Sequence, residues 1–299
     1  MAILITGDTH GSRGIHRLSP ESFPEGESLD REDFVIIAGD FQVIYAHGGM
    51  TKHEEQMLQW LSSRPWTTLF IDGNHEHMPR LRSLPLEQRF GGRVGRAAPH
   101  VYYLLRGERY DIDDRSVLCL GGAISIDRHR RIPGESWFEE EIPTELDVLT
   151  ARQSAARGPV DLFLTHTCPP DIKFQLPIHN RNDISDPTEH ILADLRPLVR
   201  PRNWVFGHFH VNWKGRDNGI DYTCLFDEIA LLDPKLGIIP LGKKPMTRRP
   251  PDQSHLPPPA STATTPAKLP RASRRAPSPP TVQTVTDTPS GGFGTWGGE

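Results

Sequence analysis

Short runs of apolar residues recur along the first 240 positions, and many of them stop at a glycine or at a polar side chain. Runs of four or five such residues, bounded by turn residues, are typical of strands that lie inside a sheet. We therefore predict buried strands at positions 2–6, 34–38, 67–71, 161–165 and 204–206.

Helices are predicted where capping residues precede apolar positions at helical spacing. These helices are expected at 52–63, near 79–84, over about fifteen residues from 142, and at 187–198. Closely spaced runs predict antiparallel hairpins that begin a second sheet at 101–105, 110–112, 116–120 and 123–126, with closing strands at 221–226 and 236–239. Residues 13–32 are expected to form a loop with one helical turn.

The composition changes near position 240. Residues 241–299 contain 12 of the 29 prolines and eight Lys/Arg against three Asp/Glu, although the whole chain carries a net charge of −4. Such a segment buries too little apolar surface to offset its loss of conformational entropy. We expect one domain over 1–240 and a proline-rich, basic, disordered tail over 241–299. The tail is either a contact for nucleic acid or a plain solvated extension.

Hydropathy and cysteine usage narrow the cellular setting. Mean hydropathy is −0.49, and no apolar run approaches the roughly 18 residues that span a bilayer. The three cysteines, Cys119, Cys168 and Cys224, are far apart and show no CxxC spacing. We therefore expect a cytoplasmic protein without disulfides and without a membrane partner.

Polar side chains with metal-binding chemistry follow five of the predicted strands. Because the carboxyl ends of parallel strands meet at one edge of a sheet, these groups are expected to converge. If the extended backbone continued past the first strand, Asp8 and His10 would point to the same side. Gly73 is expected to allow a sharp turn, and Asp72 is a candidate either to orient a ligand imidazole or to cap that turn. The candidate groups are Asp8 with His10, Asp40, Asn74 with His75, His166, and His208 with His210.

The ordered motifs DTHG, GD, GNHE, TH and GHFH, spread over residues 2–239, resemble those of the calcineurin-like metallophosphoesterase superfamily, including its small bacterial and phage members. The resemblance implies an α/β fold, a sandwich of two mixed β-sheets flanked by helices (α/β/β/α), with two divalent metals at the carboxyl ends of the strands. It assigns one metal to Asp8, His10 and His210. It assigns the other to Asn74, His166 and His208, with Asp40 bridging the two.

Such a site suits phosphoester hydrolysis. Two divalent ions and two aspartates leave about two positive charges to attract a phosphoryl group. A water that bridges the ions would become the attacking hydroxide. His75 is left over as the proton donor to the departing oxygen. Manganese, iron or zinc suit these carboxylate, amide and imidazole donors, and magnesium suits them less well.

Two segments bear on the substrate. Protein phosphatases of the superfamily extend the second motif as GDxVDRG, whereas here Phe41 follows Asp40 and the arginine is missing, which argues against a protein substrate. Arg128 and Arg131 are candidates to orient a phosphate through forked hydrogen bonds. An exposed charged turn is the alternative interpretation of those arginines.

We therefore expect a dinuclear metal-dependent hydrolase that acts on a phosphomonoester or a phosphodiester. A nuclease or nucleotide phosphodiesterase, with the basic tail guiding nucleic acid to the site, is one alternative. A catalytically silent metal-binding scaffold is another.

Overall fold

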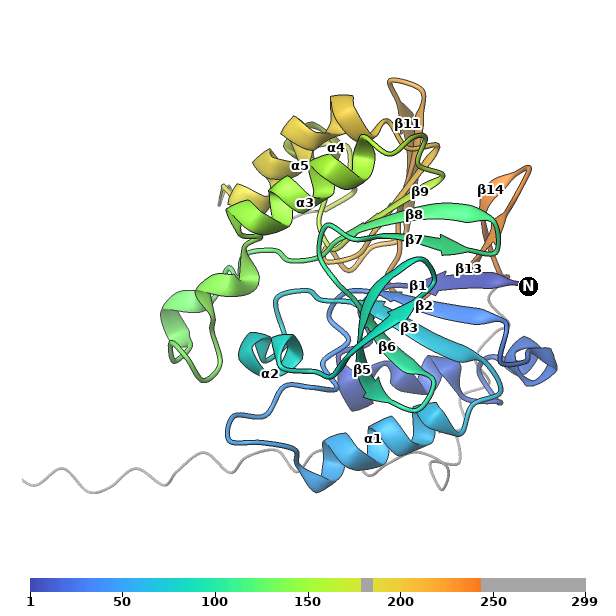
Figure 1. Ribbon diagram of the computed structural model, residues 1–299, viewed down its shortest axis with the longest axis vertical. Helices are drawn as coiled ribbons and strands as arrows, with labels where there is room; N and C mark the ends of the chain where they lie inside the picture. The colour runs from blue at the N-terminus through green and yellow to red at the C-terminus, as the bar shows by residue number, and fades with distance from the viewer. Residues whose placement is uncertain (179–184, 243–299) are drawn as a thin grey trace, which may run out of the picture. The chain divides into compact units, whose positions relative to one another are not determined.

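The computed structural model describes residues 1–178 and 185–242, which form two β-sheets stacked face to face (Figure 1). The first sheet has the strand order β14-β13-β1-β2-β3-β6-β5-β4. Its strands are β1 (Ile3–Thr6), β2 (Phe34–Ala38), β3 (Thr67–Ile71), β4 (Leu86–Arg89), β5 (Gly92–Ala98), β6 (Val101–Leu104), β13 (Ile229–Asp233) and β14 (Gly237–Pro240).

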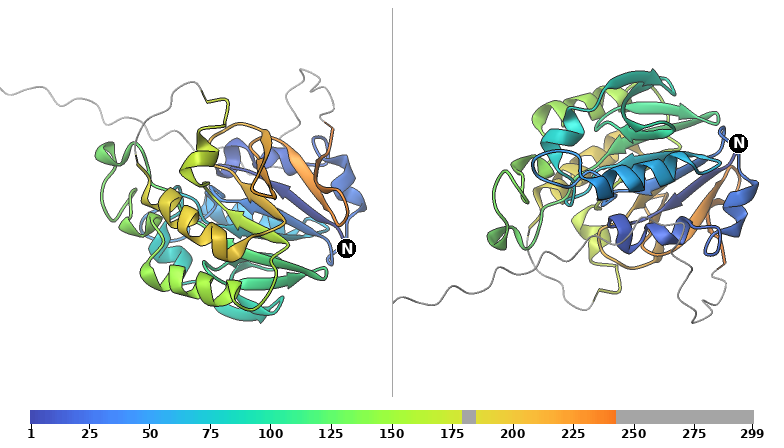
Figure 2. Two further views of the ribbon diagram at one scale, coloured as in Figure 1. Left: turned by 90° about the horizontal axis from the view of Figure 1, so that it is seen from above. Right: turned by 90° about the horizontal axis from the view of Figure 1, so that it is seen from below.

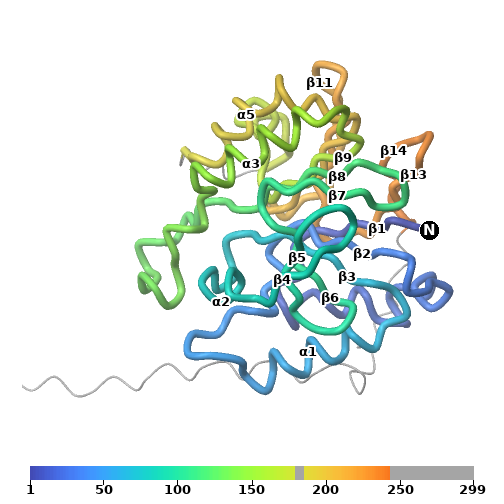
Figure 3. The backbone as a smooth tube through the Cα atoms, viewed as in Figure 1, coloured from blue at the N-terminus to red at the C-terminus, as the bar shows by residue number. Residues whose placement is uncertain are grey.

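The second sheet has the order β11-β12-β10-β9-β8-β7. It is made of β7 (Arg109–Ile112), β8 (Arg115–Leu120), β9 (Leu162–Thr165), β10 (Asn203–Phe206), β11 (Trp213–Asp217) and β12 (Ile220–Cys224). Both sheets are mixed: β1, β2, β3 and β6 are parallel, as are β8, β9, β10 and β12, and the outer strands are antiparallel. After β12 the chain returns to the first sheet, where β13 pairs with β1 (Figure 3).

Helices cover the outer faces of both sheets (Figure 2). The helices α1 (Lys52–Ser62) and α2 (Met78–Arg82) pack on the first sheet, and α3 (Glu145–Ala155), α4 (Pro170–Lys173) and α5 (Pro187–Val199) pack on the second. Alternation along β2 shows the layering, since Ile36 faces the other sheet whereas Val35 and Ile37 face α1. The predicted α/β/β/α sandwich is therefore confirmed.

The five buried strands that precede the candidate ligands all form where they were expected. Capping residues are present at two of the predicted helices: Thr51 and Glu54 make a reciprocal capping box at α1, and the Asp186 side chain accepts the Thr188 N–H at α5. The helix expected from 142 begins instead at Glu145, because Thr144 and Asp147 form its capping box.

Other predictions were wrong. The strand β6 lies beside β3 in the first sheet, so the second sheet begins only at β7. Residues 123–126 form no strand. The segment 13–32 contains more helix than one turn, because the 3₁₀ helices η1 (Gly11–Arg13), η2 (Ile15–Leu18) and η3 (Pro24–Ser28) occur there.

Two further expectations can be compared with the described residues. None of the helices within 1–178 and 185–242 has the length and apolar character needed to cross a membrane. The three cysteines are buried free thiols. The predicted tail lies outside the described residues, apart from positions 241 and 242.

Candidate metal centre

Four candidate ligands gather at the edge of the sheets where β1, β2 and β10 end. One ligand atom from each of Asp8, His10, Asp40 and His210 lies within 4.8 Å of the others. His10 Nε2 and His210 Nε2 are 2.9 Å apart, and His210 Nε2 is 3.4 Å from Asp8 Oδ2. Imidazole nitrogens and carboxylate oxygens that face one another at such distances match the donor set of a transition-metal site.

The remaining candidates form a second group on the other side of Asp40. His166 Nε2 lies 3.3 Å from Asn74 Oδ1 and 3.3 Å from Asp40 Oδ1, and His208 Nδ1 lies 3.1 Å from Asn74 Oδ1. Asp40 Oδ2 is also 3.8 Å from His10 Nε2. The seven side chains that the sequence singled out as ligands therefore lie together, although their role as ligands stays a prediction.

Neighbouring groups orient two of these side chains. His166 Nδ1 lies 3.0 Å from the carbonyl oxygen of Ala38, so a proton on Nδ1 leaves Nε2 as the electron-pair donor of the neutral ring. The Asn74 amide donates from Nδ2 to Ser125 Oγ over 3.2 Å, which turns its Oδ1 toward the two histidines. Both side chains thus present a donor atom that fits a cation.

Burial and charge act in opposite directions on the titratable groups. Burial raises the pKa of Asp8 to about 7. Burial would also raise the pKa of Asp40, but the nearby imidazoles, His166 foremost, hold it below its usual value. Burial would lower the pKa of His166, yet the charges of Asp40 and Asp8 raise it to about 10. A proton on His166 therefore offsets part of the buried negative charge in the protein alone, and a bound divalent cation would supply positive charge in its place.

The backbone of the ligand loops takes conformations that side chains rarely adopt. His10, Asp40, His208 and His210 have φ angles of 46°, 46°, 69° and 54°. The expected extended continuation from Asp8 to His10 is therefore wrong. Residues held in this left-handed region cost on the order of 1–3 kcal/mol each and persist where surrounding contacts fix them.

Hydrogen bonds between loops fix this geometry. The His10 N–H donates to the Asp40 carbonyl over 2.8 Å, and the His208 N–H donates to the Asp8 carboxylate over 3.0 Å. The Asp40 carboxylate accepts the N–H groups of Asn74 and His75. Each buried carboxylate thus joins strand ends that are distant in sequence.

Glycine is required beside the ligands for a reason that the sequence did not reveal. A Cβ atom on Gly73 would lie 2.2 Å from Asp40 Oδ1 and 2.6 Å from His166 Nε2. A Cβ on Gly207 would lie 2.3 Å from Asp8 Oδ1. The φ angle of Gly73 is outside the left-handed range, so close approach, and not a strained backbone conformation, explains why this residue is glycine.

His75 lies at the rim of the cluster. Its Nε2 is 3.8 Å from Asp40 Oδ2, its side chain is 30% exposed, and its ring packs edge-on against His10. Burial is the main cause that lowers its pKa below the usual value. The geometry leaves this imidazole beside the candidate ligands and open to a substrate.

The two candidate arginines differ in position. Arg131 Nη1 donates to the Asn74 carbonyl over 3.1 Å, and its Nε lies 2.7 Å from Asp127 Oδ1. Arg128 is exposed in the 3₁₀ helix η4 (Arg128–Arg130). The structure therefore brings Arg131 to the edge of the cluster, whereas Arg128 faces solvent.

Sequence reasoning missed the residues that support the ligands from behind. The carboxylate of Glu76 accepts the N–H groups of Gln42 and Gly73, and Ser125 holds Asn74. Asp72 binds Arg106 and Tyr103 in the interior, so neither role expected for it is observed. The position of Ser125, shortly after a buried strand, was the one signal in the sequence for its role.

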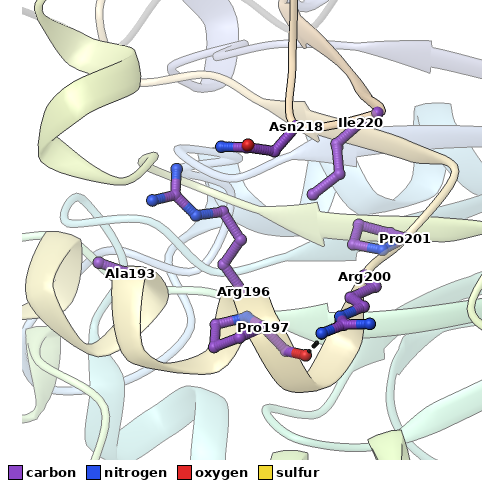
Figure 4. A pocket seen from close by; sticks show the side chains of 8 residues that line it. Ala193, Arg196, Pro197, Arg200, Pro201, Asn218 and Ile220 are labelled. Atoms are coloured by element: carbon purple, nitrogen blue, oxygen red, sulfur yellow. Dashed lines mark hydrogen bonds between the residues drawn. The ribbon is translucent and has the colours of Figure 1, made fainter.

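A cavity lies at the amino-terminal ends of β10 and β12, away from the candidate ligands. It has a volume of about 530 Å³ and opens between the end of α5 and the turn that joins β11 to β12, with Arg196, Arg200 and Asn218 in its wall (Figure 4). Arg196 is paired with Asp171 at 2.6 Å, and Arg200 donates to the Pro197 carbonyl. Its arginines are thus already engaged, far from the candidate ligands.

Sequence comparison finds curated relatives of low identity. Two curated relatives are named lariat debranching enzyme: one from Schizosaccharomyces pombe is 27% identical over 212 residues, 60% of this chain and 43% of that protein. One from Danio rerio is 27% identical over 247 residues, 71% of this chain and 41% of that protein. The chain thus spans about two fifths of the length of these relatives.

A solved structure and a family profile complete the comparison. The structure of TT1561 of Thermus thermophilus matches 78% of this chain and 93% of its own, with a TM-score of 0.47 and 16% identity. Residues 1–212 match the profile of the calcineurin-like phosphoesterases. That match covers most of the chain, and this protein therefore belongs to the calcineurin-like phosphoesterase family.

Proposed function

We propose that this protein is a dinuclear metal-dependent phosphoesterase that hydrolyses a phosphomonoester or a phosphodiester. One cation would be held by Asp8, His10 and His210, and the other by Asn74, His166 and His208. The observation that carries the proposal is the position of Asp40, which faces His10 with one carboxylate oxygen and His166 with the other. A carboxylate shared in this way suits a bridging ligand.

Divalent ions held there would supply positive charge for the phosphoryl group and an activated water as nucleophile. Manganese, iron and zinc fit the mixture of imidazole, amide and carboxylate donors better than magnesium does. The protein keeps the donors in place through the loop hydrogen bonds described above.

His75 is proposed to donate the proton to the departing oxygen. Its Nε2 lies near Asp40 Oδ2 but outside the cluster of the four closest ligand groups. Its partial exposure leaves room for a substrate. A bound phosphate would raise the pKa of this imidazole and so favour the protonated form that the role requires.

The first experiment tests the bridging carboxylate. Protein stripped with a chelator and reloaded with manganese, iron, zinc or magnesium should bind two ions and hydrolyse a chromogenic phosphate ester only when loaded. Asp40→Asn should bind fewer than two ions and lose at least about a hundredfold in activity, because a neutral amide replaces a shared anionic ligand.

The control for this variant is Asp114→Asn, which makes the same chemical change at an exposed position. It should keep both ions and full activity. Two ions and normal turnover in Asp40→Asn would contradict the proposal. Loaded protein that binds two ions and yet cleaves no monoester or diester would favour the silent metal-binding scaffold.

A nuclease or nucleotide phosphodiesterase is the second candidate. Similarity to proteins named lariat debranching enzyme is the observation that favours this candidate. Turnover of chromogenic monoester and diester substrates, with and without residues 241–299, separates the candidates. A diester preference that falls on removal of the basic segment supports guidance of nucleic acid, whereas an unchanged preference confines recognition to the domain.

A further inference from the structure

A pocket of about 240 Å³ adjoins the cluster. Its walls come from the loop after β2, the loop after β3 and the segment 131–138, and include Gln42, Tyr45, His75, Arg131, Glu135 and Ser136. Its volume is below the roughly 300–1,000 Å³ of pockets for drug-sized ligands. It therefore fits one small group and not a run of nucleotides.

The position of His75 indicates which part of a substrate this pocket would bind. Its imidazole lines the pocket, and its Nε2 also lies 3.8 Å from Asp40 Oδ2. If His75 protonates the departing oxygen, that oxygen lies next to this ring. The remainder of the leaving group then extends into the pocket that the ring lines.

The walls suit a flat, polar group. Tyr45 is half-buried, and Phe138, also in the wall, is buried against His77. The partly exposed Tyr45 ring can accept a planar ring by stacking, whereas Phe138 is too deeply buried to do so. Gln42, Glu135 and Ser136 add hydrogen-bonding groups to the same walls. A simple alkyl alcohol would use neither feature.

The charge of the pocket is largely balanced within the protein. Arg131 is paired with Asp127 at 2.7 Å and lies 3.8 Å from Glu141 Oε1. Glu135 contributes a further carboxylate. Because carboxylates already balance the charge of Arg131, this arginine attracts a further phosphate on the leaving group only weakly. The walls therefore favour an uncharged occupant.

We propose that this pocket binds the leaving group of the substrate and that its preferred occupant is a nucleoside. The inference depends on the proposed phosphoesterase function. In the hydrolysis, the oxygen of water forms a bond to phosphorus while the bond from phosphorus to the nucleoside oxygen breaks. That nucleoside oxygen takes its proton from His75 Nε2, and the nucleoside leaves as a neutral alcohol. The attacking water loses one proton to solvent, and solvent then returns a proton to His75.

The experiment uses thymidine 5′-(methyl phosphate), a diester in which thymidine and methanol compete to leave the same phosphorus. Full-length protein loaded with manganese should release thymidine and methyl phosphate in preference to methanol and thymidine phosphate. The ratio of the two products, measured by chromatography, compares the two orientations within one molecule. It is therefore independent of the amount of active enzyme.

Variants of the pocket should move this ratio. Tyr45→Ala should lower the release of thymidine relative to methanol about tenfold, in line with the loss of one stacking contact. Glu135→Ala, at an exposed residue whose replacement spares the core, should lower it about threefold through loss of a hydrogen-bond acceptor. The matched control is Glu139→Ala, also exposed and outside the pocket, which should keep the wild-type ratio.

Two outcomes would overturn the inference alone: predominant release of methanol by the wild type, or an unchanged ratio in both pocket variants. Failure of the loaded protein to cleave this diester and the chromogenic esters alike would instead reject the proposed function, and the inference with it. Content of bound manganese, measured for each variant, separates a change in the pocket from loss of the metal site.

Discussion

The side chain of Asn74 shows how a single hydrogen bond sets the chemistry of a candidate ligand. An amide presents either an oxygen or an NH₂ group, and only the oxygen can bind a cation. The bond from Asn74 Nδ2 to Ser125 Oγ selects the oxygen. Ser125 is in turn fixed by its N–H, which donates to Glu141 Oε2 over 2.9 Å.

Ser125→Ala should therefore weaken binding of one of two ions by about 10- to 100-fold, the usual range for loss of a supporting hydrogen bond at a metal site. Calorimetric titration with manganese measures the effect. The matched control is Ser116→Ala, which removes a buried hydroxyl that has no hydrogen-bond partner within the described residues. Equal affinities in the two variants would show that Ser125 does not orient the amide.

His75→Ala should separate metal binding from turnover. Because His75 is not among the proposed ligands, the variant should keep two ions, while turnover of a substrate with a poor leaving group should fall about 10²- to 10⁴-fold. A substrate with a nitrophenol leaving group, which needs less protonation, should suffer a smaller loss. Equal losses for the two substrates, or full activity, would exclude the proton-donor role. His53→Ala, in α1, serves as the control.

Among the elements, the buried strands that precede the candidate ligands were the ones that the sequence predicted best. The strands that carry the candidate ligands are buried on both faces, and their continuous apolar runs made them visible. The strands β4, β5 and β11 were missed because exposed and half-buried residues interrupt any such run. The strand β13 was also missed, although its sequence is apolar and mostly buried. Hydrophobicity therefore predicts strands mainly where they are buried in the core.

Partners of the strands were harder to predict. A run such as 101–104 specifies a strand but not its neighbour, and β6 joined β3 in the first sheet. The run 123–126 is nearly as apolar, yet the N–H groups of Ile124 and Ser125 donate to the side chains of Asp186 and Glu141. Side chains that are distant in sequence accept the N–H groups that a neighbouring strand would otherwise have bound. The local sequence pattern cannot predict such partners.

The contact between α4 and α5 provides a prediction about pH. Burial raises the pKa of Glu189 to about 7, although Lys173 Nζ, 2.7 Å away, acts in the opposite direction and the charge of Asp186 adds to the rise. The folded state thus holds this proton more tightly than the unfolded chain, whose glutamates titrate near 4.5. Protonated Glu189 therefore adds to the free energy of unfolding below about pH 4.5, and this contribution is lost as pH rises toward 7.

Glu189→Gln should flatten that dependence, because glutamine resembles the protonated acid at every pH. Urea unfolding at several values between pH 4.5 and 7.5 would measure the slope for both proteins. Glu55→Gln, at an exposed position of α1, should keep the wild-type slope. A Glu189→Gln protein that loses stability with pH as steeply as the wild type would contradict this account.

At the scale of the whole molecule, the cluster joins the two sheets. Asp8, Asp40 and Asn74 follow strands of the first sheet, whereas His166, His208 and His210 follow strands of the second. The positions of these residues at strand ends predicted that they would lie together, and their role as ligands stays a prediction. It could not predict the pocket beside the cluster, since the walls come from loops whose paths depend on tertiary contacts.

Metal binding should therefore stabilise the fold as a unit. A ligand that binds only the folded state adds about 2.7 kcal/mol at 100 times its Kd. Thermal unfolding with increasing manganese should show a steady rise in Tm that a chelator reverses. The rise should be smaller in Asp40→Asn and intact in His75→Ala. A Tm that does not respond to manganese would argue against cations that link the two sheets.

The absence of room at Gly73 and Gly207 limits how this centre can be altered. Main-chain atoms of one loop press directly on the ligands of another, so even a methyl group would push a carboxylate aside. At these two points the spacing of the candidate ligands is consequently set by the backbone. Redesign of the proposed site should therefore keep both glycines and change the donor atoms or the groups that orient them.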